Sequence, residues 1–571
     1  MKYIQELTSE SKIAYFSMEV GFRNDIPTYS GGLGVLAGDT IKSAADLNLP
    51  MVAVTLIYRK GFFRQEIDAG GRQVEHPEEW NPAEQMSLVP QKIRLTIEDR
   101  EVAVQAWVYN ISSLVTKWNV PIFFLDTDLP ENAPEDRQLT HYLYGGDDRY
   151  RLKQEMVLGI GGVLMLRALG FRIKKYHMNE GHAALLTLEL LKRHRRDIES
   201  VWDEREIWDV EKVKDLCVFT THTPVEAGHD KFPYDMVRQV VGETIPIDVL
   251  KDLAGKDKLN MTLLAMNLSQ YINGVAKKHG EVSKILFPGY KIQAITNGVH
   301  SFTWTCESFA RLYDKYLPGW ANEPELFVRI DKIPPVELWD AHMEAKKKLV
   351  DFVNRLTGAS MDYDTLTIGF ARRATAYKRA NLLLSDIERL KKIGSGRIQV
   401  IYAGKAHPKD GDGKRNIEEI IRKAGVLKDS IKIVYLQNYN MDLALQMVSG
   451  VDVWLNTPMR PREASGTSGM KAAHNGVINF SVLDGWWIEG HIEGYTGWSI
   501  GPPPTEATLT QSTFEQDAED LYNKLENLVL PTYYNHREIW IKMMENSIGK
   551  VAYYFNSHRM MRRYVTEAYI R

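Results

Sequence analysis

The chain has 571 residues, of which 44% are hydrophobic and 25% are charged, and its 71 basic side chains nearly balance 74 acidic ones. A chain this long exceeds what one hydrophobic core usually supports, so we expect two large domains, and the composition excludes a largely disordered protein. The formal charge of -3 argues against nucleic acid and anionic membranes as partners, and no segment approaches the roughly 20 apolar residues of a membrane span.

The sequence contains only two cysteines, Cys217 and Cys306. So low a number is typical of reduced cytosolic proteins rather than of disulfide-stabilised secreted domains. We therefore expect both cysteines to be buried thiols and the protein to be cytoplasmic.

Short apolar runs rich in β-branched residues recur along the chain, and each is followed by small residues and then by a helix-like segment. Alternating strands and helices are typical of α/β proteins, whose parallel sheets carry helices on both faces. Ligands of such sheets bind beyond the carboxyl ends of the strands, so the polar residues that follow each run are the candidate site residues. The predicted strands cover residues 51–58, 120–128, 215–224, 365–374, 398–406, 431–439 and 450–458.

These runs form two sets, which are separated by a largely helical stretch from Glu307 to Leu356. We place a domain boundary near residue 300, which gives domains of residues 1–300 and 301–571. The last segment, residues 535–571, has the periodicity of helices and can pack on either domain, including back on the N-terminal one.

The first candidate motif is TYSGGLGVLAGDT, residues 28–40, in which Gly31, Gly32 and Gly34 precede a predicted helix. Glycine allows backbone N–H groups to approach an anion closely, and the dipole at a helix N-terminus favours negative charge. Taken alone, the motif is equally compatible with a phosphate-binding loop and with a tight turn between helix and strand.

A second motif, FARRATAYKRANLL, places Arg372, Arg373 and Lys378 after the apolar run TLTIGF. Arginine binds phosphate through a rigid fork of N–H groups, and lysine binds it as a mobile point charge. A solvent-exposed basic helix start is the alternative interpretation. The position directly after a buried strand favours phosphate binding.

The third motif, EASGTSGMKAAHNG at residues 463–476, surrounds Lys471 with small residues. We expect a helix to begin near Met470, which places Lys471 in the first turn, where the helix dipole disfavours a cation. Burial among small residues also lowers the pKa of a lysine, which suits Schiff-base formation with a carbonyl group. Thr467 and Ser468 can cap the helix, but capping accounts for neither the glycines nor the lysine.

Polar residues also follow predicted strands in the first half of the chain. Glu180 and several histidines suggest a metal site, but no HExxH or comparable ligand spacing occurs, so we expect no metal. Lone histidines are more often structural, and this is the prediction for His177, His182 and His229. The further candidates here are Asn179, His222, Asn297 and His300.

Together these motifs resemble those of the α-glucan phosphorylases, the family of glycogen, starch and maltodextrin phosphorylases. The family motif EASGT-x-x-MK corresponds to residues 463–471, its GGLG loop to residues 31–34, and its basic motif to Arg373 and residues 377–379. The matching motifs lie in the family's order between residues 14 and 490. The patterns PTYSGGLGVLAGDT and LDGWWIEG resemble the short bacterial and archaeal branch of the family.

The resemblance implies a GT-B-like fold, in which two Rossmann-like domains face a deep catalytic cleft. It also implies phosphorolysis, in which inorganic phosphate cleaves a terminal α-1,4-glucosidic bond of a glucan or maltodextrin and releases α-D-glucose 1-phosphate with retention. The family's cofactor is pyridoxal 5'-phosphate, whose phosphate group acts as acid and base. Family members are commonly dimeric, so we expect a homo-oligomer. Because the chain begins almost directly at IAYFSMEVGF, we expect no control by phosphoserine or nucleotides.

The resemblance assigns residues to three roles. The expected catalytic residues are Lys471, Arg373, Lys378 and His222. The expected cofactor-binding residues are Lys471, Arg372, Thr467, Ser468, Tyr439, Gly31 and Gly32. The expected substrate-binding residues are Gly32, Leu33, Asn297, Tyr377, Glu463, Ser465 and Gly466.

Three positions depart from the family pattern and affect the predicted phosphate contacts. Arg372 replaces a lysine, Ser30 precedes GGLG where an asparagine is usual, and Asn440 stands where an arginine is usual. Two other functions fit parts of the sequence. A sugar-nucleotide-dependent glucan synthase shares the fold but needs no pyridoxal, and the full motif around Lys471 argues against it. A non-catalytic glucan-binding protein could use some of the 13 tryptophans, but leaves the basic motif unexplained.

Overall fold

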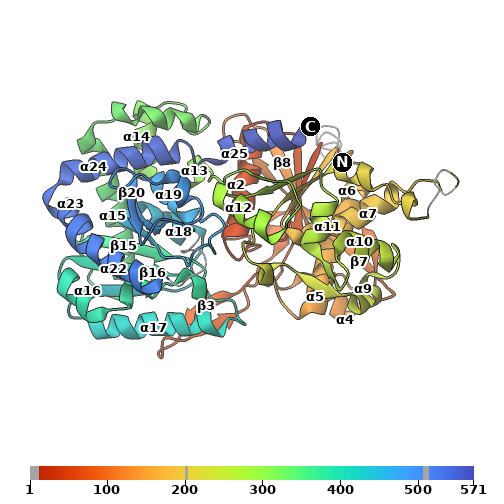
Figure 1. Cartoon of the computed structure of the whole chain (residues 1–571), viewed down its shortest axis with the longest axis horizontal. Coiled ribbons are helices and arrows are strands. Elements are labelled where there is room, and N and C mark those ends of the chain that lie inside the picture. Colours follow the sequence, from red (N-terminus) through yellow and green to blue (C-terminus); the bar gives the residue numbers. More distant parts are fainter. Residues whose placement is uncertain (1–11, 198, 200–203, 506–512, 571) are drawn as a thin grey trace.

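The computed structural model describes residues 12–197, 199, 204–505 and 513–570. These residues form two halves that lie side by side, each built around a sheet with helices on its faces (Figure 1). The predicted α/β class is confirmed, and the arrangement of two Rossmann-like halves is GT-B-like. The two sheets draw their strands from residues 13–294 and 366–500. The division of the chain at residue 300 stays a prediction.

The first sheet has ten strands, in the spatial order β14-β13-β10-β9-β1-β2-β8-β7-β5, with β6 paired to β7. Pairing is parallel from β14 to β8 and antiparallel around β7. The strands are β1 (Ile13–Ser17), β2 (Met51–Leu56), β5 (Ser87–Leu88), β6 (Ile93–Ile97), β7 (Arg100–Ser112), β8 (Asn119–Asp126), β9 (Lys175–Asn179), β10 (Cys217–Thr220), β13 (Tyr271–Gly274) and β14 (Ile292–Ala294).

The second sheet has six strands, all parallel, in the order β17-β16-β15-β18-β19-β20. Its central strands are buried along their whole length, which explains why they are continuous apolar runs rather than alternating ones. The strands are β15 (Leu366–Ala371), β16 (Ile398–Ala403), β17 (Lys432–Leu436), β18 (Val453–Asn456), β19 (Ile478–Val482) and β20 (Gly497–Ile500).

Amphipathic helices cover both sheets. In α15 (Pro335–Thr357), for example, Leu338, Ala341, Ala345 and Leu349 are buried at the three- and four-residue spacing of one helix face. The other helices used below are α2 (Gly32–Asp46), α13 (Ser301–Trp304), α14 (Glu307–Tyr316), α17 (Gly411–Leu427), α18 (Met441–Gly450), α19 (Ser468–Ala473), α24 (Arg537–Asn546) and α25 (Ser557–Tyr564).

All seven strands predicted from the sequence are present. The strands outside the predicted ranges include parallel ones, such as β1, β13, β19 and β20, as well as the antiparallel elements. Strand β6 alternates buried and exposed residues, so its period-two pattern was a usable signal. The hairpin of β3 (Arg64–Ile67) and β4 (Gln73–His76) consists mainly of polar residues and has no such signal. It is held by contacts with the second half of the chain, which sequence periodicity does not encode.

Each sheet has a switch point, where the chain reverses the direction in which it adds strands. In the first sheet the switch lies between β1 and β9, and in the second it lies between β15 and β18. Ligands of open α/β sheets bind at the carboxyl ends of strands that flank such a point. The residues at those ends include Glu19, Asn179, Arg372 and Asn456.

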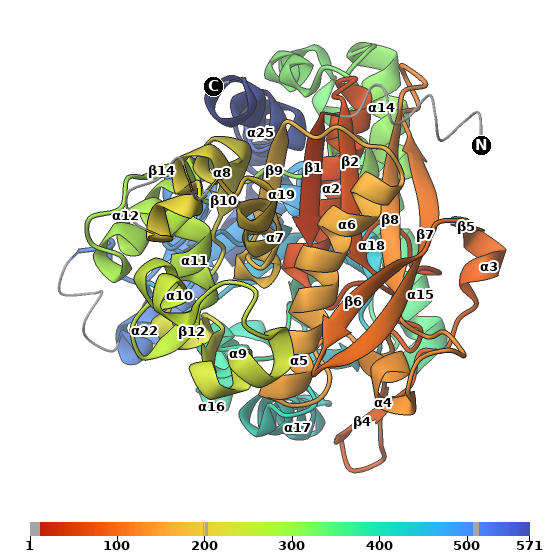
Figure 2. The same cartoon turned by 90° about the vertical axis from the view of Figure 1, so that its right-hand side faces the viewer.

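The last helix returns to the first half of the molecule. Met560 and Met561 of α25 pack with Tyr15 and Ile41 in the core of the first half, and α25 lies close to that sheet (Figure 2). Two connections between the halves run side by side, because Val299 N–H donates to Phe555 and its carbonyl accepts from Ser557 N–H. The helical periodicity of residues 535–571 was compatible with packing on either half, so it did not predict this choice.

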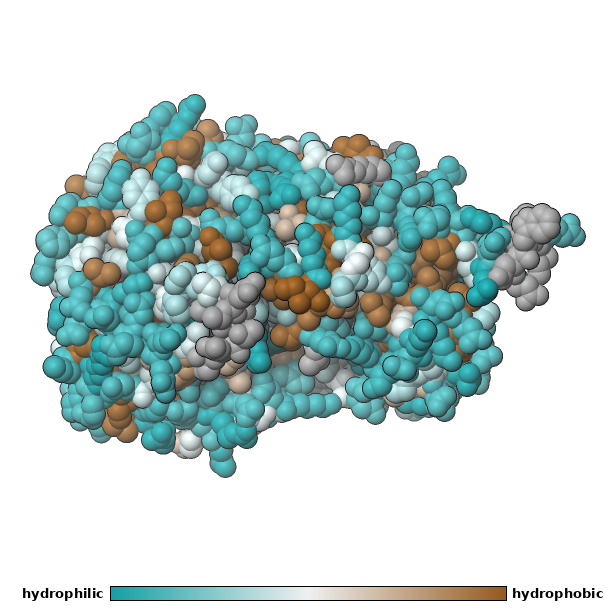
Figure 3. Space-filling view, viewed as in Figure 1, coloured by the Kyte–Doolittle hydropathy of each residue, from teal (hydrophilic) through white to brown (hydrophobic). Residues whose placement is uncertain are grey.

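The surface in the view of Figure 3 is mostly hydrophilic, with hydrophobic residues in scattered patches. None of the helices among the described residues is both long and apolar enough to cross a lipid bilayer. Both cysteines are free, but only Cys217 is fully buried. The prediction of a buried thiol is therefore wrong for Cys306, which is half-buried and lies 3.4 Å from the Ser308 hydroxyl.

Candidate functional site

Arg372 and Lys378 meet Glu463 at the carboxyl edge of the second sheet. Arg372 follows β15, Lys378 ends a short 3-10 turn (Ala376–Lys378), and Glu463 lies between β18 and α19. One nitrogen of each cation lies 2.6 Å from the same oxygen, Oε2, of Glu463. All three side chains are 9% exposed, so this is a nearly buried charge cluster with one carboxylate for two cations.

The cluster strongly favours the charged form of Glu463. Burial alone would raise the pKa of Glu463, but the charges of Arg372 and Lys378 and their hydrogen bonds lower it to about 2. The cluster keeps an excess of positive charge at the switch point between β15 and β18, where a phosphate group could bind. It also joins residues that the sequence assigned separately to cofactor, phosphate and sugar.

Asp484 holds the loop that carries Glu463. It follows β19, and its carboxylate accepts hydrogen bonds of 2.9 Å from the N–H groups of Glu463 and Gly485. Trp486 N–H also donates to the Ser465 carbonyl. Gly485 has a positive φ of 55°, and a Cβ there would lie 2.4 Å from the Ser465 oxygen, so the close approach of the two loops requires glycine.

Lys471 lies on α19 and is 7% exposed. The helix begins at Ser468 rather than near Met470, which puts Lys471 in the last turn, so the predicted placement in the first turn is wrong. As predicted from the small residues around it, burial lowers the pKa of Lys471 to about 8, against the opposing charge of Asp39.

The wall beside Lys471 comes from both halves of the chain. Its amine lies 3.8 Å from the centroid of the Trp304 ring, and Trp304 donates a hydrogen bond of 2.8 Å to Asp39 on α2. Within the part of the chain that the structure describes, no group accepts a hydrogen bond from the Lys471 amine. The amine is thus buried against an aromatic face and available to a ligand.

The glycine-rich loop forms the N-terminus of α2. Glu19, which follows β1, accepts hydrogen bonds from Ser30 N–H at 2.6 Å and Gly31 N–H at 3.2 Å. The N–H groups of Gly32 and Leu33 occupy the first two positions of α2, which have no acceptor inside a helix. Ser30 thus fixes the loop through Glu19, which accounts for this departure from the family pattern.

The remaining residues predicted for phosphate binding are dispersed. Arg373 is exposed and makes no ion pair among the described residues. Tyr439 is half-buried in the core of the second half, where burial raises the pKa of its hydroxyl and the charge of Arg372 opposes this. Ser468 accepts a hydrogen bond from Trp454 at 3.1 Å, and Thr467 immediately precedes α19.

Asn440, the third departure from the family pattern, caps a helix. Its side chain accepts a hydrogen bond of 2.9 Å from Leu443 N–H at the start of α18. Met441 N–H in turn donates to Asn24 and to the Tyr29 hydroxyl in the first half of the chain. Asn440 therefore positions a helix that contacts the loop before GGLG.

His222 follows β10 and is tied to the neighbouring strand end. Its N–H donates to Glu180 at 2.7 Å, and its ring lies 2.6 Å from the Asn179 oxygen. Glu180 has a positive φ of 78°, a strained conformation for a glutamate, which its hydrogen bonds to Gly181, His222 and Thr223 stabilise. Burial lowers the pKa of His222 to about 3, so its ring is neutral at pH 7.

Two predicted sugar-binding residues have buried polar atoms without partners. The Asn297 side-chain oxygen and the Ser465 hydroxyl make no hydrogen bond within the described ranges of the chain. A buried unpaired polar atom costs about 1–3 kcal/mol, and such atoms commonly mark ligand contacts. Gly466, with φ of 88°, bends the loop between Ser465 and α19. The Tyr377 carbonyl accepts from Met459 N–H, and the Tyr377 ring lies 4.5 Å from the Lys378 amine.

The sequence analysis missed four residues that shape this site: Glu19, Asp39, Trp304 and Asp484. Glu19 and Asp484 lie two residues after β1 and β19, so the criterion of strand ends would have found them had these two strands been predicted. Asp39 and Trp304 lie on helices 265 positions apart, and no local pattern connects them.

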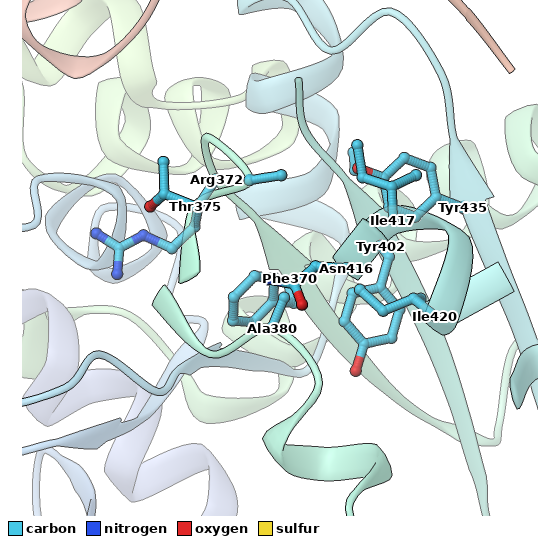
Figure 4. Close-up of a pocket in the computed structure, with 11 residues that line it drawn as sticks. Phe370, Arg372, Thr375, Ala380, Tyr402, Asn416, Ile417, Ile420 and Tyr435 are labelled. Carbon is cyan, nitrogen blue, oxygen red and sulfur yellow. The ribbon is translucent and has the colours of Figure 1, made fainter. Parts of the chain in front are cut away.

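A small cavity of about 10 Å³ lies beside this site, between β15, β16 and α17 (Figure 4). Its lining is mainly apolar, including Phe370, Tyr402, Ile417 and Ile420, and the Arg372 guanidinium points away from these side chains. Its volume matches one water molecule, so it is too small for a sugar or a cofactor.

Comparison with known proteins places the chain in a family. The carbohydrate phosphorylase family model matches residues 23–111 and 247–494, which include the glycine loop, the basic motif and Lys471. Maltodextrin phosphorylase of Thermococcus litoralis is 40% identical over 98% of this chain and 70% of the relative. Glycogen phosphorylase of Aquifex aeolicus is 36% identical over 99% of this chain and 87% of the relative.

An uncharacterized protein of Methanocaldococcus jannaschii is 32% identical, and the match covers 97% of this chain and 99% of that protein. Relatives of similar and of greater length thus share nearly the whole of this sequence. The match of the family model covers β15 and β18, which flank the switch point of the second sheet, and the glycine loop at residues 31–34. The chain belongs to the carbohydrate phosphorylase family.

Proposed function

We propose that the protein cleaves terminal α-1,4-glucosidic bonds of α-glucans or maltodextrins with inorganic phosphate and releases α-D-glucose 1-phosphate with retention. The observation that carries this proposal is the motif EASGTSGMK, whose first residue, Glu463, pairs with Arg372 and Lys378 and whose last, Lys471, has a buried amine. Relatives named maltodextrin phosphorylase and glycogen phosphorylase support this choice of substrate.

The proposed cofactor is pyridoxal 5'-phosphate, and the residues around Lys471 suit it. Because burial lowers the pKa of Lys471 to about 8, part of the amine is neutral at pH 7 and can attach to a carbonyl. A Cβ at Gly31 or Gly32 would meet no atom within 4 Å, so this side of the site has open space. When bound, the cofactor would supply a phosphate group that titrates near neutrality and works as acid and base. The residues assigned to it are Lys471, Arg372, Thr467, Ser468, Tyr439, Gly31 and Gly32.

The cations and the N-terminus of α2 would bind phosphate. Two phosphate groups repel one another strongly at close range, and fixed positive charge in a nearly buried site offsets this repulsion. We assign Arg373, Lys378 and the N–H groups of Gly32 and Leu33 to the substrate phosphate. The excess of cations over Glu463 and the unpaired N–H groups at the start of α2 support this assignment.

Glucose would be oriented by polar groups of both halves. We assign Glu463, Ser465, Gly466, Asn297, Tyr377 and the main chain of His222 to the hydroxyl groups of the terminal glucose. The unpaired buried atoms of Asn297 and Ser465 support this, since each gains a hydrogen bond when a hydroxyl binds. Because Glu180 occupies the His222 N–H, the His222 carbonyl is the group left for a sugar.

The test is an assay with maltodextrins of graded length and inorganic phosphate that measures glucose 1-phosphate, combined with a near-ultraviolet absorption spectrum. Lys471→Ala should lose both the pyridoxal absorption and the activity. Lys405→Ala is the matched control, because Lys405 is also a buried lysine whose pKa burial lowers to about 8, and it should keep the absorption. Active protein without pyridoxal would refute the proposal, and glucan extension from UDP-glucose or ADP-glucose would favour a synthase. The homo-oligomeric state and the cytoplasmic location stay predictions.

A further inference from the structure

Three potential metal ligands converge beside the two connections between the halves. Asp46 ends α2, His300 immediately precedes α13, and His558 is the second residue of α25. The Nε2 atoms of His300 and His558 lie 2.8 and 3.4 Å from the same oxygen, Oδ2, of Asp46. One ligand atom from each side chain lies within 4.8 Å of the other two, and the imidazole rings stack at 5.7 Å.

His558 supplies a second and independent observation. Its side chain is 0% exposed, and neither ring nitrogen makes a hydrogen bond within the described residues. An imidazole always offers a donor or a lone pair at each nitrogen, and leaving such a group buried and unpaired is unfavourable. A ligand at Nε2, which faces Asp46, would remove part of this cost.

We propose that Asp46, His300 and His558 bind a divalent transition-metal ion, with Zn²⁺ as the best fit. Two neutral imidazoles and one carboxylate form a common ligand set for Zn²⁺, and a water molecule can complete a tetrahedron. With metal–ligand distances of about 2.0–2.2 Å, neighbouring ligand atoms lie roughly 3.3 Å apart. The separation of His558 and Asp46 already has this value, and that of His300 and Asp46 needs to lengthen by about half an ångström.

The surrounding charges are compatible with a dication. Lys42 lies one turn before Asp46 and donates to the Thr303 hydroxyl at 3.0 Å, so its charge opposes a metal. Burial lowers the pKa of Lys42, whereas Asp39 and Asp46 oppose that shift and add negative charge to the region. The Nδ1 atom of His300 lies 2.8 Å from the Thr303 hydroxyl and 3.3 Å from the Thr303 N–H. With a metal on Nε2, Nδ1 would carry the proton and donate it to the hydroxyl, as in metal sites whose second nitrogen is held by a protein group, and the longer contact with the N–H would be given up.

The ion would have a structural role. Helix α2 begins at the glycine loop and ends at Asp46, and α13 begins after His300 and ends at Trp304, the residue that covers Lys471. An ion that joins α2, α13 and α25 would therefore fix the two walls of the site against each other. The inference uses only these contacts and does not depend on the proposed function.

The test uses the full chain without a histidine tag, freed of metal with EDTA and then freed of EDTA by dialysis. Zn²⁺ and Co²⁺ are added separately. We expect one Co²⁺ per chain with visible d–d absorption, displacement of that ion by Zn²⁺, and a rise in Tm of several degrees on adding either ion. The variants Asp46→Asn and His558→Gln should lose this absorption and the metal-dependent rise in Tm.

His536→Gln is the matched control, because His536 is exposed and its ion pair is with Glu538 rather than with any of the three ligands, and it should respond to metal as the unchanged protein does. X-ray absorption of the Zn²⁺-loaded unchanged protein should show two imidazole ligands, a measurement that remains decisive if a buried variant fails to fold. The inference is overturned if the unchanged protein binds no stoichiometric Co²⁺, if its Tm ignores metal, or if the His558→Gln protein responds equally.

Discussion

The carboxylate of Asp484 accepts a hydrogen bond of 2.9 Å from the backbone N–H of Glu463. One buried acid therefore positions another, and the two have opposite electrostatic situations. Glu463 faces two cations, which lower its pKa. The pKa of Asp484 is instead raised to about 7, mainly by burial and also by the charge of Glu463. The hydrogen bonds from the N–H groups of Glu463 and Gly485 oppose this rise.

Asp484→Asn should change how stability depends on pH. Between pH 4 and 7 folded protein keeps the Asp484 proton that unfolded protein releases, so ionisable Asp484 makes stability fall as pH rises, by about 4 kcal/mol over the full window. The variant lacks this titration. Its Tm relative to the unchanged protein should therefore rise between pH 5 and pH 8, as measured by calorimetry.

The matched control for this prediction is Asp410→Asn. Asp410 also accepts a backbone hydrogen bond, of 2.8 Å from Gly413 N–H, where it caps α17. Its substitution should shift Tm by a similar amount at both pH values. A difference between Asp484→Asn and unchanged protein that stays constant from pH 5 to pH 8 would contradict the assignment.

Glu463→Gln should lower activity and increase the response to anions. Losing one charge-assisted hydrogen bond of about 1.5–3 kcal/mol corresponds to a roughly 10- to 100-fold loss of kcat/KM. Arg372 and Lys378 would then lack their carboxylate, so added inorganic phosphate should raise the Tm of the variant more than that of the unchanged protein.

Glu463→Gln should also change how Tm depends on pH in acid. Because the pKa of Glu463 is lowered to about 2, the cluster stabilises the fold above about pH 4.5, and this contribution of about 3 kcal/mol is lost as pH falls towards 2. Glu463→Gln should thus show a shallower loss of Tm below pH 4.5. Glu493→Gln is the control. Hydrogen bonds from His491 and Ser499 lower the pKa of Glu493 to about 2, although burial opposes this. Added phosphate should raise the Tm of Glu493→Gln as much as that of the unchanged protein. Equal phosphate responses in both variants would refute the cluster's role.

Gly34→Ala should distort the glycine loop. A Cβ at Gly34 would lie 2.7 Å from the Glu19 carboxylate and 2.7 Å from Tyr29, so Glu19 must move away from Ser30 and Gly31. Overpacking of this kind typically costs about 1–3 kcal/mol. We expect a lower Tm and a raised KM for phosphate.

Gly31→Ala tests whether the effect comes from packing rather than from loss of any glycine. Gly31 has an extended backbone with φ of -166°, and a Cβ there meets no atom within 4 Å. Its Tm should remain close to that of the unchanged protein. Destabilisation as large as that of Gly34→Ala would show that the contact with Glu19 is not the cause.

The hairpin of β3 and β4 ties the first half of the chain to the second. The Gln73 amide donates to the Ala406 carbonyl and accepts from the Ala406 N–H, both at 2.9 Å. Gln73→Ala would leave both backbone groups of Ala406 buried and unpaired, which should cost about 1–3 kcal/mol in urea unfolding. Glu66→Gln on the same hairpin weakens the largely exposed contact with His76 and should cost less than about 1 kcal/mol. Equal losses in the two variants would argue against a role of the hydrogen bonds between Gln73 and Ala406 in joining the two halves.

The sequence predicted seven strands of the two large sheets, but not the hairpin of β3 and β4 or its contacts with the second half of the chain. All seven predicted strands exist because buried parallel strands need continuous β-branched and apolar runs, a property of a few neighbouring residues. The residues of the hairpin of β3 and β4, including Gln73, show no such pattern. The hairpin is held by hydrogen bonds to partners more than 300 positions away in the chain.

The same division applies to the site. Strand ends and glycine-rich turns identified Arg372, Lys378, Glu463 and Lys471, because each follows a buried strand or lies in a short run of small residues. The start of α19 was misplaced by two residues, but the predicted cause of the lowered pKa of Lys471, burial among small residues, is confirmed. Local pattern thus predicted the burial of Lys471 and located its helix to within two residues.

By itself the sequence determined the fold class, the order of the motifs and the family, since these depend on residues close together in the chain. Only the tertiary structure decided that Arg372 and Lys378 share one oxygen of Glu463, and that Trp304 covers Lys471. Those contacts arise where strand ends of both sheets and the two connections between the halves meet. Distances between segments are set by packing of the whole chain, so no stretch of sequence contains them.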